Sequence, residues 1–442
     1  MYKKRRGHYQ IVTVCVVVLM ISLLGFPAQA EKYLGADINW DQFSGQQIRL
    51  MMNKHWFTDG LQPQVAEFEK NTGIKVVFDI YPEEAFWTKL KVELAGGLPT
   101  VDGFMVGSLD MGSYTAAGWL EPLNKFFEDK RLMDKKWYEF EDLYPTAIGA
   151  GTYQDKLLVI PVGTEAEIMF FRKDLLAQKG LTIPKTYQEL YEAAKKLKTD
   201  EVAGYVSRGL RGLSIVWEWT GFLLSHGGDY FDASDMPAFN SPAGIRASEM
   251  YGKLLRETGP EGVINYGWYE VMAASQQGKI AIGIEASGAL PPLESEESTV
   301  VGKIGYTQIP AALGQKVTPN YWFWNLGMNP RSQRKEATFL FLMWATSKPV
   351  CLRIARGAGV SAARLSVWED PLFYELQNRE WIDACIKAMS LVEPERVPYL
   401  NPKYPEIADI ISVELQNIVL GTKSAKTGLD EAAKLISELI RR

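Results

Sequence analysis

The segment from Tyr153 to Leu197 constrains the fold of this chain more than any other part. It joins an apolar strand, a short stretch that carries Glu165, a second apolar run and a helix. Thr186 and Glu189 form a capping box at the start of that helix. Two apolar strands joined through a stretch with one carboxylate suit a hinge between two lobes. We therefore predict a hinge here, with Glu165 at the place where a bound molecule would sit.

The first thirty residues are typical of an export signal. Four basic residues from Lys3 to Arg6 precede an apolar stretch, and Ala28-Gln29-Ala30 is a cleavage site of the A-x-A type. The apolar stretch, Ile11 to Phe26, is short for a membrane span. Cys15 lies inside it and not at its end, which disfavours a lipid anchor. We expect cleavage to leave a periplasmic product with an irregular leader over residues 31–45; association with the cell surface stays open.

Charge and length narrow the class of protein further. Signal cleavage removes four basic residues and no acidic ones, so the 48 Lys and Arg fall to 44 against 53 Asp and Glu, a net charge of −9. No stretch rich in Lys or Arg remains, which disfavours nucleic acid as a partner. A mature chain of this length favours two lobes of roughly 100–200 residues each. Cys351 and Cys385 remain, and the sequence leaves open whether they pair or stay as small buried side chains.

Strands and helices alternate along the chain. A strand over 48–52, a helix that starts near Thr58 and ends at Gly73, and a strand over 74–78 form a βαβ unit. Such units predict an α/β fold with mixed, mostly parallel sheets flanked by helices. The pattern predicts further strands at 100–106 and 279–284, and further helices at 111–119, from 242, at 334–346 and at 430–440.

Several of these segments resemble the extracellular solute-binding proteins of carbohydrate ABC importers, the family that includes maltodextrin-binding protein. The resemblance covers nearly the whole mature chain and rests on the order and spacing of Phe68-Glu-Lys-Asn-Thr-Gly-Ile-Lys-Val76, Ala116-Ala-Gly-Trp-Leu-Glu-Pro-Leu123, Phe171-Arg-Lys-Asp-Leu175, Gly227-Gly-Asp-Tyr-Phe-Asp232, Phe239-Asn-Ser-Pro242 and Gln277-Gly-Lys-Ile-Ala281.

The resemblance implies a two-lobe periplasmic-binding-protein fold of type II with three crossings between the lobes. The crossings would lie near 160–165, 318–325 and 347–349. Lobe 1 would then comprise residues 46–160 and 318–347, and lobe 2 would comprise residues 161–317 and 348–442.

The resemblance also implies ligand-contacting residues in lobe 1 and at the first crossing. Glu165 matches a glutamate of the family that contacts sugar, and a carboxylate accepts hydrogen bonds from sugar hydroxyls. Its alternative role is a hinge carboxylate that backbone amides satisfy. Asn53, His55 and Trp56 follow the first strand, at the edge where open α/β sheets bind ligands. A packed lid is the alternative role of Trp56.

A second set of candidates follows other strands. Ser108 and Asp110 lie in a loop that aligns with a binding loop, although Val106 replaces a family tryptophan and Asp110 suits a helix N-cap equally well. Glu285 and Ser287 follow the strand at 279–284, where Gly288 replaces another tryptophan. This second replacement would suit a smaller or differently tilted ligand.

The remaining candidates come from the middle and the end of the chain. Trp217 and Trp219 match aromatic platforms of the family, and flat rings suit the C–H faces of sugars. Two residues apart on a helix, they point in different directions, so at most one is a platform. Trp324 is the preferred tryptophan of the second crossing. Arg364 would bind hydroxyls or else clamp an acidic residue across the lobes, and Tyr404 lies near an aligned stacking tryptophan.

Known enzyme patterns are missing from the sequence. His55 and His226 are the two histidines of the mature chain, and H-E-x-x-H, C-x-x-C, G-x-S-x-G and the Walker pattern do not occur. We expect no catalytic residues, no metal and no cofactor. We predict a monomer that binds a sugar and delivers it to the transmembrane subunits of an ABC permease with a separate ATPase. A binding protein for a polyol is the alternative, and a secreted glycoside hydrolase that uses Glu165 and Glu285 is a remote one.

Overall fold

The computed structural model describes residues 35–97, 99–358 and 361–441. The expected export signal and the start of the expected leader, up to residue 34, lie outside the described residues, as do Gly359 and Val360 of the loop before Arg364. Across the described part, no helix combines the length and the apolarity needed to cross a bilayer.

The strands confirm the α/β prediction. They are β1 (Gln47–Asn53), β2 (Lys75–Tyr81), β3 (Gly103–Gly107), β4 (Thr152–Tyr153), β5 (Lys156–Leu157), β6 (Val159–Arg172), β7 (Ala203–Val206), β8 (Ile280–Ala286), β9 (Ile304–Gln308) and β10 (Tyr321–Met328). Eight of them form one sheet in the order β2-β1-β3-β10-β6-β8-β7, with β9 also paired to β6. The sheet is mixed: β1 pairs in parallel with β2 and β3, as does β7 with β8, whereas the pairs around β6 and β10 are antiparallel.

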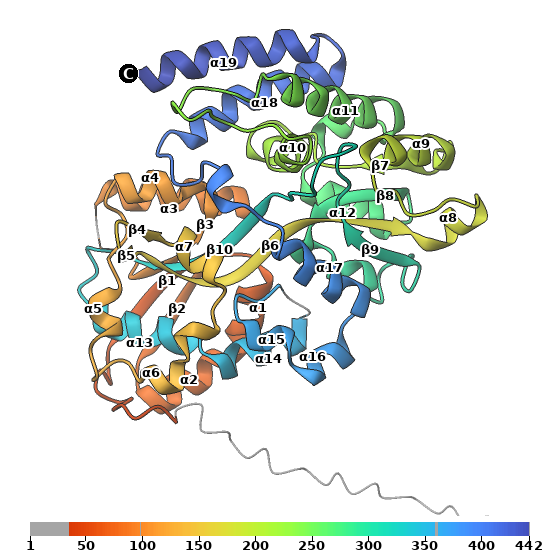
Figure 1. The fold of residues 1–442 in the computed structure, drawn as a ribbon. Helices are drawn as coiled ribbons and strands as arrows, with labels where there is room; N and C mark the ends of the chain where they lie inside the picture. The colour runs from red at the N-terminus through yellow and green to blue at the C-terminus, as the bar shows by residue number, and fades with distance from the viewer. Residues whose placement is uncertain (1–34, 98, 359–360, 442) are drawn as a thin grey trace, which may run out of the picture. The chain divides into compact units, whose positions relative to one another are not determined.

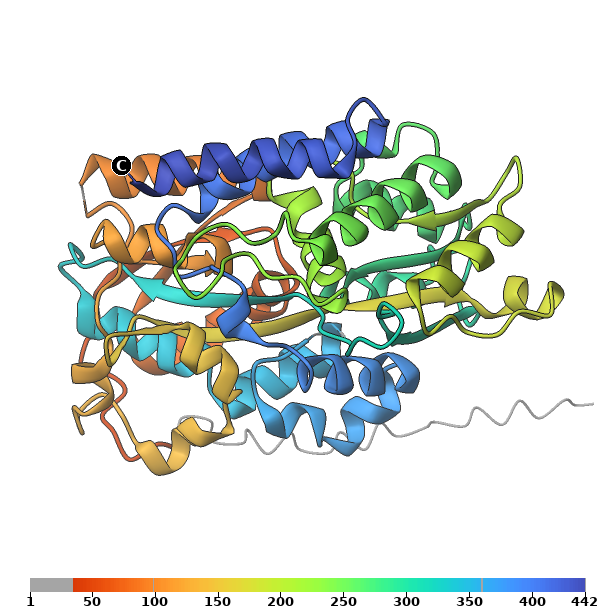
Figure 2. The same ribbon diagram turned by 45° about the horizontal axis from the view of Figure 1, so that its top comes forward.

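The strand β6 joins the two ends of this sheet (Figure 2). Its first part, Val159–Ala166, pairs with β10, and its second part, from Glu167 onward, pairs with β8 and β9. Every residue of β6 except the last is buried. The two apolar runs that the sequence predicted on either side of Glu165 are therefore one continuous strand.

Helices cover the sheet and extend beyond it (Figure 1). They are α1 (Trp56–Leu61), α2 (Val65–Thr72), α3 (Glu83–Gly96), α4 (Met111–Ala116), α5 (Asn124–Phe127), α6 (Lys135–Tyr138), α7 (Pro145–Ala150), α8 (Lys173–Gln178), α9 (Tyr187–Leu197), α10 (Leu213–Ser225), α11 (Pro242–Thr258), α12 (Trp268–Gln276), α13 (Lys335–Ala345), α14 (Lys348–Ala358), α15 (Leu365–Trp368), α16 (Pro371–Leu376), α17 (Arg379–Met389), α18 (Tyr404–Leu420) and α19 (Ala425–Arg441). α3 packs on β1 and β2, α9 on β7 and β8, and α17 on β6 and β9, while α18 packs against α10, α11 and α19.

Two helix starts differ from the sequence prediction. α19 begins at Ala425, five residues before the predicted start at 430. α1 begins at Trp56 and not near Thr58, because the ring Nδ1 of His55 accepts a hydrogen bond from the amide of Phe57 at 3.3 Å and acts as the N-cap. The predicted end of this helical region is confirmed: Gly73 follows α2 with a positive φ of 67°, a conformation that favours glycine.

Both thiols of the described chain are free and buried. Burial raises the pKa of Cys351 to about 11 and raises the pKa of Cys385 as well. These cysteines are small core side chains and do not form a disulfide with each other.

The capping box of α9 gives a test of the local argument. The Thr186 hydroxyl accepts from the Glu189 amide at 3.2 Å, while Glu189 accepts from the Lys185 and Thr186 amides. We expect Thr186→Ala to lower the free energy of unfolding by about 1 kcal/mol, since the amide loses its partner. Urea unfolding followed by circular dichroism measures this loss. Lys196→Ala on the exposed face of the same helix is the control, and an equal loss in both variants would contradict the cap.

Candidate functional site

The Glu165 carboxylate meets two side chains that follow β1. Trp56 Nε1 donates to Glu165 Oε1 at 3.5 Å, and His55 Nε2 lies 3.8 Å from the same oxygen. The side chains of His55 and Glu165 are each only 10 % exposed. The structure thus brings three of the predicted residues together from β6 and from the start of α1.

Aromatic rings extend this group to β10, the strand that carries Trp324. The His55 ring lies 4.6 Å from Trp56 and 4.9 Å from Trp324, between ring centroids. Trp324 is stacked on Trp87 of α3 at 5.5 Å with an angle of 10° between the planes. We call these five residues the hinge cluster: His55, Trp56, Trp87, Glu165 and Trp324.

Three glycines make room for the hinge cluster. A Cβ atom on Gly163 would lie 2.6 Å from the Trp56 ring, and one on Gly107 would lie 2.8 Å from the Trp87 ring and 2.3 Å from the Trp322 ring. A Cβ atom on Gly288 would lie 2.4 Å from Glu165 Oε1. The Glu165 carboxylate therefore occupies space that a side chain at position 288 would need. This contact is a physical reason why position 288 is a glycine here, although the resemblance implies a tryptophan at this position.

Glu285 lies in a second polar group, beyond the hinge cluster along β6 and β8. It receives Arg208 Nε at 3.0 Å on both carboxylate oxygens and a further bond from Arg208 Nη2. Glu218 lies 3.4 Å from Arg208 Nε, and the ring of Trp217 lies 4.8 Å from the guanidinium carbon. We call these four residues the arginine cluster: Arg208, Trp217, Glu218 and Glu285.

Burial sets the charge state of the arginine cluster. Glu218 and Glu285 are fully buried. Burial, followed by the neighbouring charge of Glu285, raises the pKa of Glu218 well above its ordinary value. Burial alone would lower the pKa of Arg208, but Glu285 and Glu218 reverse this and raise it. Arg208 therefore stays a cation that pairs with the Glu285 carboxylate, whereas burial favours the protonated, neutral form of Glu218.

Ser287 joins the end of β8 to its neighbours. Its hydroxyl accepts from the Ala166 amide at 3.3 Å and lies 3.1 Å from the Ser361 hydroxyl, and its carbonyl accepts from Trp381 Nε1. These contacts hold the chain next to Glu165 in position.

Ser108, Asp110 and Asn53 are buried in other surroundings. Ser108 Oγ accepts from the Phe323 amide at 2.8 Å and lines a hollow of about 500 Å³ together with Tyr321, Phe323 and Asn325. Because side chains alternate along a strand, this hollow lies on the face of β10 opposite to Trp324. Asp110 lies 3.1 Å from Lys91 Nζ, and burial raises its pKa. Asn53 Oδ1 is buried without a hydrogen-bond partner among the described residues.

Trp219, Tyr404 and Arg364 do not join either cluster. Trp219 is fully buried and donates to Ser248 Oγ at 2.8 Å. The Tyr404 hydroxyl lies 3.2 Å from that of Tyr230. Arg364, also fully buried, donates to three carbonyls (Tyr138, Glu139 and Thr346) and to Asp142 Oδ2 at 3.1 Å. Its surroundings match the clamp that the sequence left open as an alternative.

Five residues in or next to these clusters were not singled out from the sequence: Glu83, Trp87, Arg208, Glu218 and Trp268. Glu83 and Trp87 are four apart on α3, and α3 follows β2 just as Trp56 follows β1. Arg208 likewise follows β7. The rule that placed His55 and Trp56 at a strand end would have found these three. Trp268 Nε1 donates to Glu83 Oε2 at 3.1 Å across α12 and α3, and no sequence signal marks that contact.

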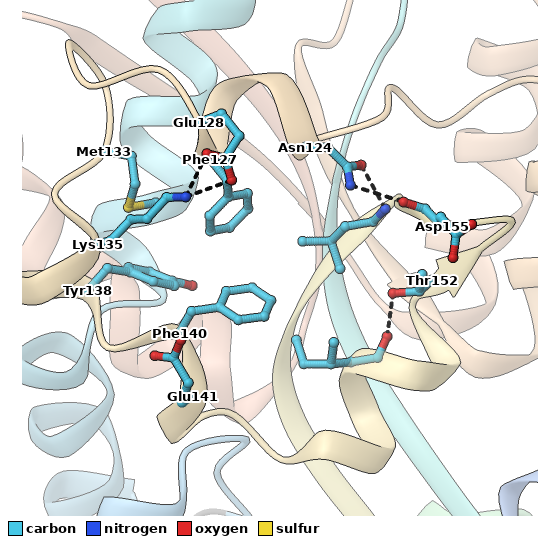
Figure 3. A pocket seen from close by; sticks show the side chains of 12 residues that line it. Asn124, Phe127, Glu128, Met133, Lys135, Tyr138, Phe140, Glu141, Thr152 and Asp155 are labelled. Atoms are coloured by element: carbon cyan, nitrogen blue, oxygen red, sulfur yellow. Dashed lines mark hydrogen bonds and ion pairs between the residues drawn. The ribbon is translucent and has the colours of Figure 1, made fainter.

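A separate hollow of about 330 Å³ lies among α5, α6, α7 and the β4–β5 hairpin (Figure 3). Phe127, Tyr138 and Phe140 form its apolar wall, and Lys135 and Glu128 pair at its rim. None of the predicted ligand residues lines it. In the described residues, no group of three or more His, Cys, Asp or Glu side chains is arranged to hold a metal ion.

The Arg364 contacts give a test that separates the clamp from ligand binding. We expect Arg364→Met to lower the free energy of unfolding by about 3 kcal/mol or more, because Asp142 and three carbonyls lose a buried partner. Ligand affinity of the folded variant should stay unchanged in calorimetry. The matched control is Arg131→Met, which removes a mostly exposed arginine paired with Asp129 and should matter far less. Loss of affinity without loss of stability would show that Arg364 contacts the ligand.

Comparisons with known proteins show the family and the fold to which this chain is similar. The family model described as bacterial extracellular solute-binding protein matches residues 55–350. The erythritol/L-threitol-binding protein of Mycolicibacterium smegmatis is 27 % identical over 340 residues, 73 % of this chain and 71 % of that protein. The mannitol-binding protein of Pseudomonas aeruginosa is 27 % identical over 363 residues, 79 % of this chain and 81 % of that protein.

A solved structure extends the match to the fold. An ABC transporter solute-binding protein from Agrobacterium radiobacter, in complex with ribitol, superposes with a TM-score of 0.82 at 27 % identity and covers 90 % of this chain and 99 % of that one. The two-lobe α/β fold that the resemblance implied is confirmed. The chain belongs to the family of bacterial extracellular solute-binding proteins.

Proposed function

We propose that this chain captures a neutral, hydroxyl-rich solute, a sugar or a sugar alcohol, between its two lobes and delivers it to an ABC permease. The observation that carries the proposal is the position of Glu165. Its carboxylate lies on the strand that both parts of the sheet share, and the rings of the hinge cluster surround it.

The chemistry of the hinge cluster suits such a ligand. An ionised carboxylate is an acceptor only, so it takes the hydroxyl protons that a sugar or polyol offers. The half-buried rings of Trp56 and Trp87 offer flat apolar surface to C–H groups, and the buried ring of Trp324 supports Trp87 from behind. In a binding site for a small molecule, a few polar groups set the orientation of the ligand and apolar contacts supply affinity.

Closure of the lobes around the ligand would supply the signal to the permease. Moving an open-to-closed equilibrium from 1:99 to 99:1 takes about 5.5 kcal/mol of preference for the closed state. Two or three hydrogen bonds to charged groups, at about 1.5–3 kcal/mol each, are enough if they form only on closure. The Trp268–Glu83 bond between α12 and α3 would add to the stability of the closed state with or without a ligand.

The transport partners and the lobe boundaries belong to the same proposal. The permease and its ATPase would be separate chains, and the periplasm would be the site of capture. The boundaries at 160, 318 and 348 stay predictions. Two observations concern the boundary at 348. α14, the first helix after it, packs against α1 and α13 of predicted lobe 1, whereas α17 packs against β6 and against β9 of predicted lobe 2.

The proposed ligand is either a sugar or a polyol. Two relatives are named for polyols and a similar structure holds ribitol, which supports a search that includes sugar alcohols. The hydrolase alternative needs two accessible carboxylates. Glu285 is fully buried and paired with Arg208, which argues against that role and favours release of the ligand unchanged.

A thermal-shift screen against mono-, di- and oligosaccharides and sugar alcohols tests the proposed function. A ligand at a hundredfold excess over its Kd adds about 2.7 kcal/mol to the stability of the folded protein. Glu165→Ala should shrink the shift that the best ligand produces, because the carboxylate acceptor is lost. Glu128→Ala, at an exposed pair with Lys135, is the control.

Three outcomes decide this test. An unchanged shift in Glu165→Ala would show that Glu165 does not hold the ligand. The absence of any shift across the whole panel would sink the proposal. Appearance of a hydrolysis product in the same tubes would favour the enzyme instead.

The bond between α12 and α3 gives a second prediction. We expect Trp268→Phe, which removes the indole donor and keeps an aromatic ring, to weaken the apparent affinity for the best ligand by about tenfold. Calorimetry measures the affinity, and small-angle scattering measures the fraction of closed protein. Trp137→Phe, whose ring packs on Trp40, is the control. Equal affinity in both variants would show that the bond makes no contribution to closure.

A further inference from the structure

Arg208 covers two carboxylates that are buried behind it. Its side chain is 14 % exposed, whereas the side chains of Glu285 and Glu218 are 0 % exposed. The Trp217 ring packs on the guanidinium at 4.8 Å. Arg208 is therefore the member of the arginine cluster that a solute can reach.

The position of Arg208 relates it to the opposite side of the site. Glu83 of α3 is close enough to act on the charge of Arg208, and Glu83 also accepts the Trp268 bond from α12. Trp87, one turn further along α3, belongs to the hinge cluster. Arg208 and the hinge cluster thus share α3 as a neighbour and border the same region of the molecule.

The planar guanidinium leaves donors for a ligand. Arginine has five N–H groups in a rigid fork, and Glu285 takes those on the edge formed by Nε and Nη2. The N–H groups of Nη1 are on the other side of the fork and point away from Glu285. They suit the oxygen of a hydroxyl group.

The charges around Arg208 oppose an anion. An arginine in a binding site often indicates a phosphate or carboxylate ligand. Here Glu285 forms two parallel bonds with the guanidinium, and Glu83 and Glu165 add two further acidic groups to the region. A phosphate would therefore meet several carboxylates against one arginine that is already paired.

We propose that Arg208 is a specificity-determining residue of this site: it donates hydrogen bonds to hydroxyl oxygens of an uncharged solute, and its pairing with Glu285 excludes phosphorylated forms of that solute. This inference rests on the proposed function and narrows its ligand class. Glu285 acts on the ligand through Arg208 and not by contact.

Calorimetry with matched pairs of compounds tests the inference on the full mature chain. The pairs are ribitol with ribitol 5-phosphate, D-mannitol with D-mannitol 1-phosphate, and D-glucose with D-glucose 6-phosphate. For the pair whose neutral member binds, we expect the phosphorylated member to bind at least a hundredfold more weakly. This measurement needs no variant, so a folding defect cannot obscure it.

Two variants then assign the effect to the arginine cluster. Glu285→Gln, which leaves Arg208 with less opposing charge, should reduce the preference for the neutral member at least tenfold. Arg208→Met should weaken binding of the neutral member at least tenfold. Glu393→Gln is the matched control, because it removes one of two carboxylates that pair with Arg396 outside both clusters. Melting curves establish that each variant is folded.

The outcomes separate this inference from the proposed function. Equal binding of both members of a pair, or an unchanged preference in Glu285→Gln, would overturn the role of Arg208 and leave solute capture intact. If no neutral compound binds, the proposed function fails and the inference fails with it.

Discussion

The continuous burial of β6 is the constraint on which the rest of the structure depends. One strand of 14 residues pairs with β10 over its first part and with β8 and β9 over its second. A backbone that is buried throughout must have its N–H and C=O groups paired, and only strands on both sides of it can provide this. The two parts of the sheet are therefore tied through the same hydrogen-bonded ladder. β6 changes its pairing from β10 to β8 and β9 between Ala166 and Glu167. A side chain near that point, such as that of Glu165, lies close to both parts of the sheet.

This constraint requires partners for the carboxylates next to the strand. Carboxylates next to a buried strand cannot remain without partners, because an unpaired buried charge is very unfavourable. Glu165 has the Trp56 indole and the His55 ring, and Glu285 has Arg208. The aromatic side chains exclude water from the same region and, since Gly163 and Gly107 carry no Cβ, lie directly against the strands. Under the proposed function, rings and carboxylates together would make a surface suited to hydroxyl groups and not to anions.

Local structure was largely predictable because local forces decide it. The capping box of Thr186 and Glu189 and the left-handed glycine at Gly73 act within a few residues, and both are found as expected. Where a local signal failed, a neighbouring side chain explains it: α1 starts at Trp56 because the ring of His55 caps it. The site was only partly predictable. The strand-end rule found His55 and Trp56, and it applies equally to Trp87 and Arg208, which follow β2 and β7. Contacts between distant segments, such as Trp268 with Glu83, leave no trace in the spacing of residues.

The sequence alone determined the alternation of strands and helices and the family resemblance, since periodicity, caps and motif order are local properties of a chain, and it marked Glu165 as a candidate. Tertiary structure alone decided which charged residues meet. Arg208 and Glu285 are 77 residues apart, and only the parallel pairing of β7 with β8 brings them together. It also decided that Arg364 and Tyr404 are buried away from the hinge cluster. Burial and pairing across the fold depend on how elements pack, and packing is a property of the whole chain that no short stretch of residues contains.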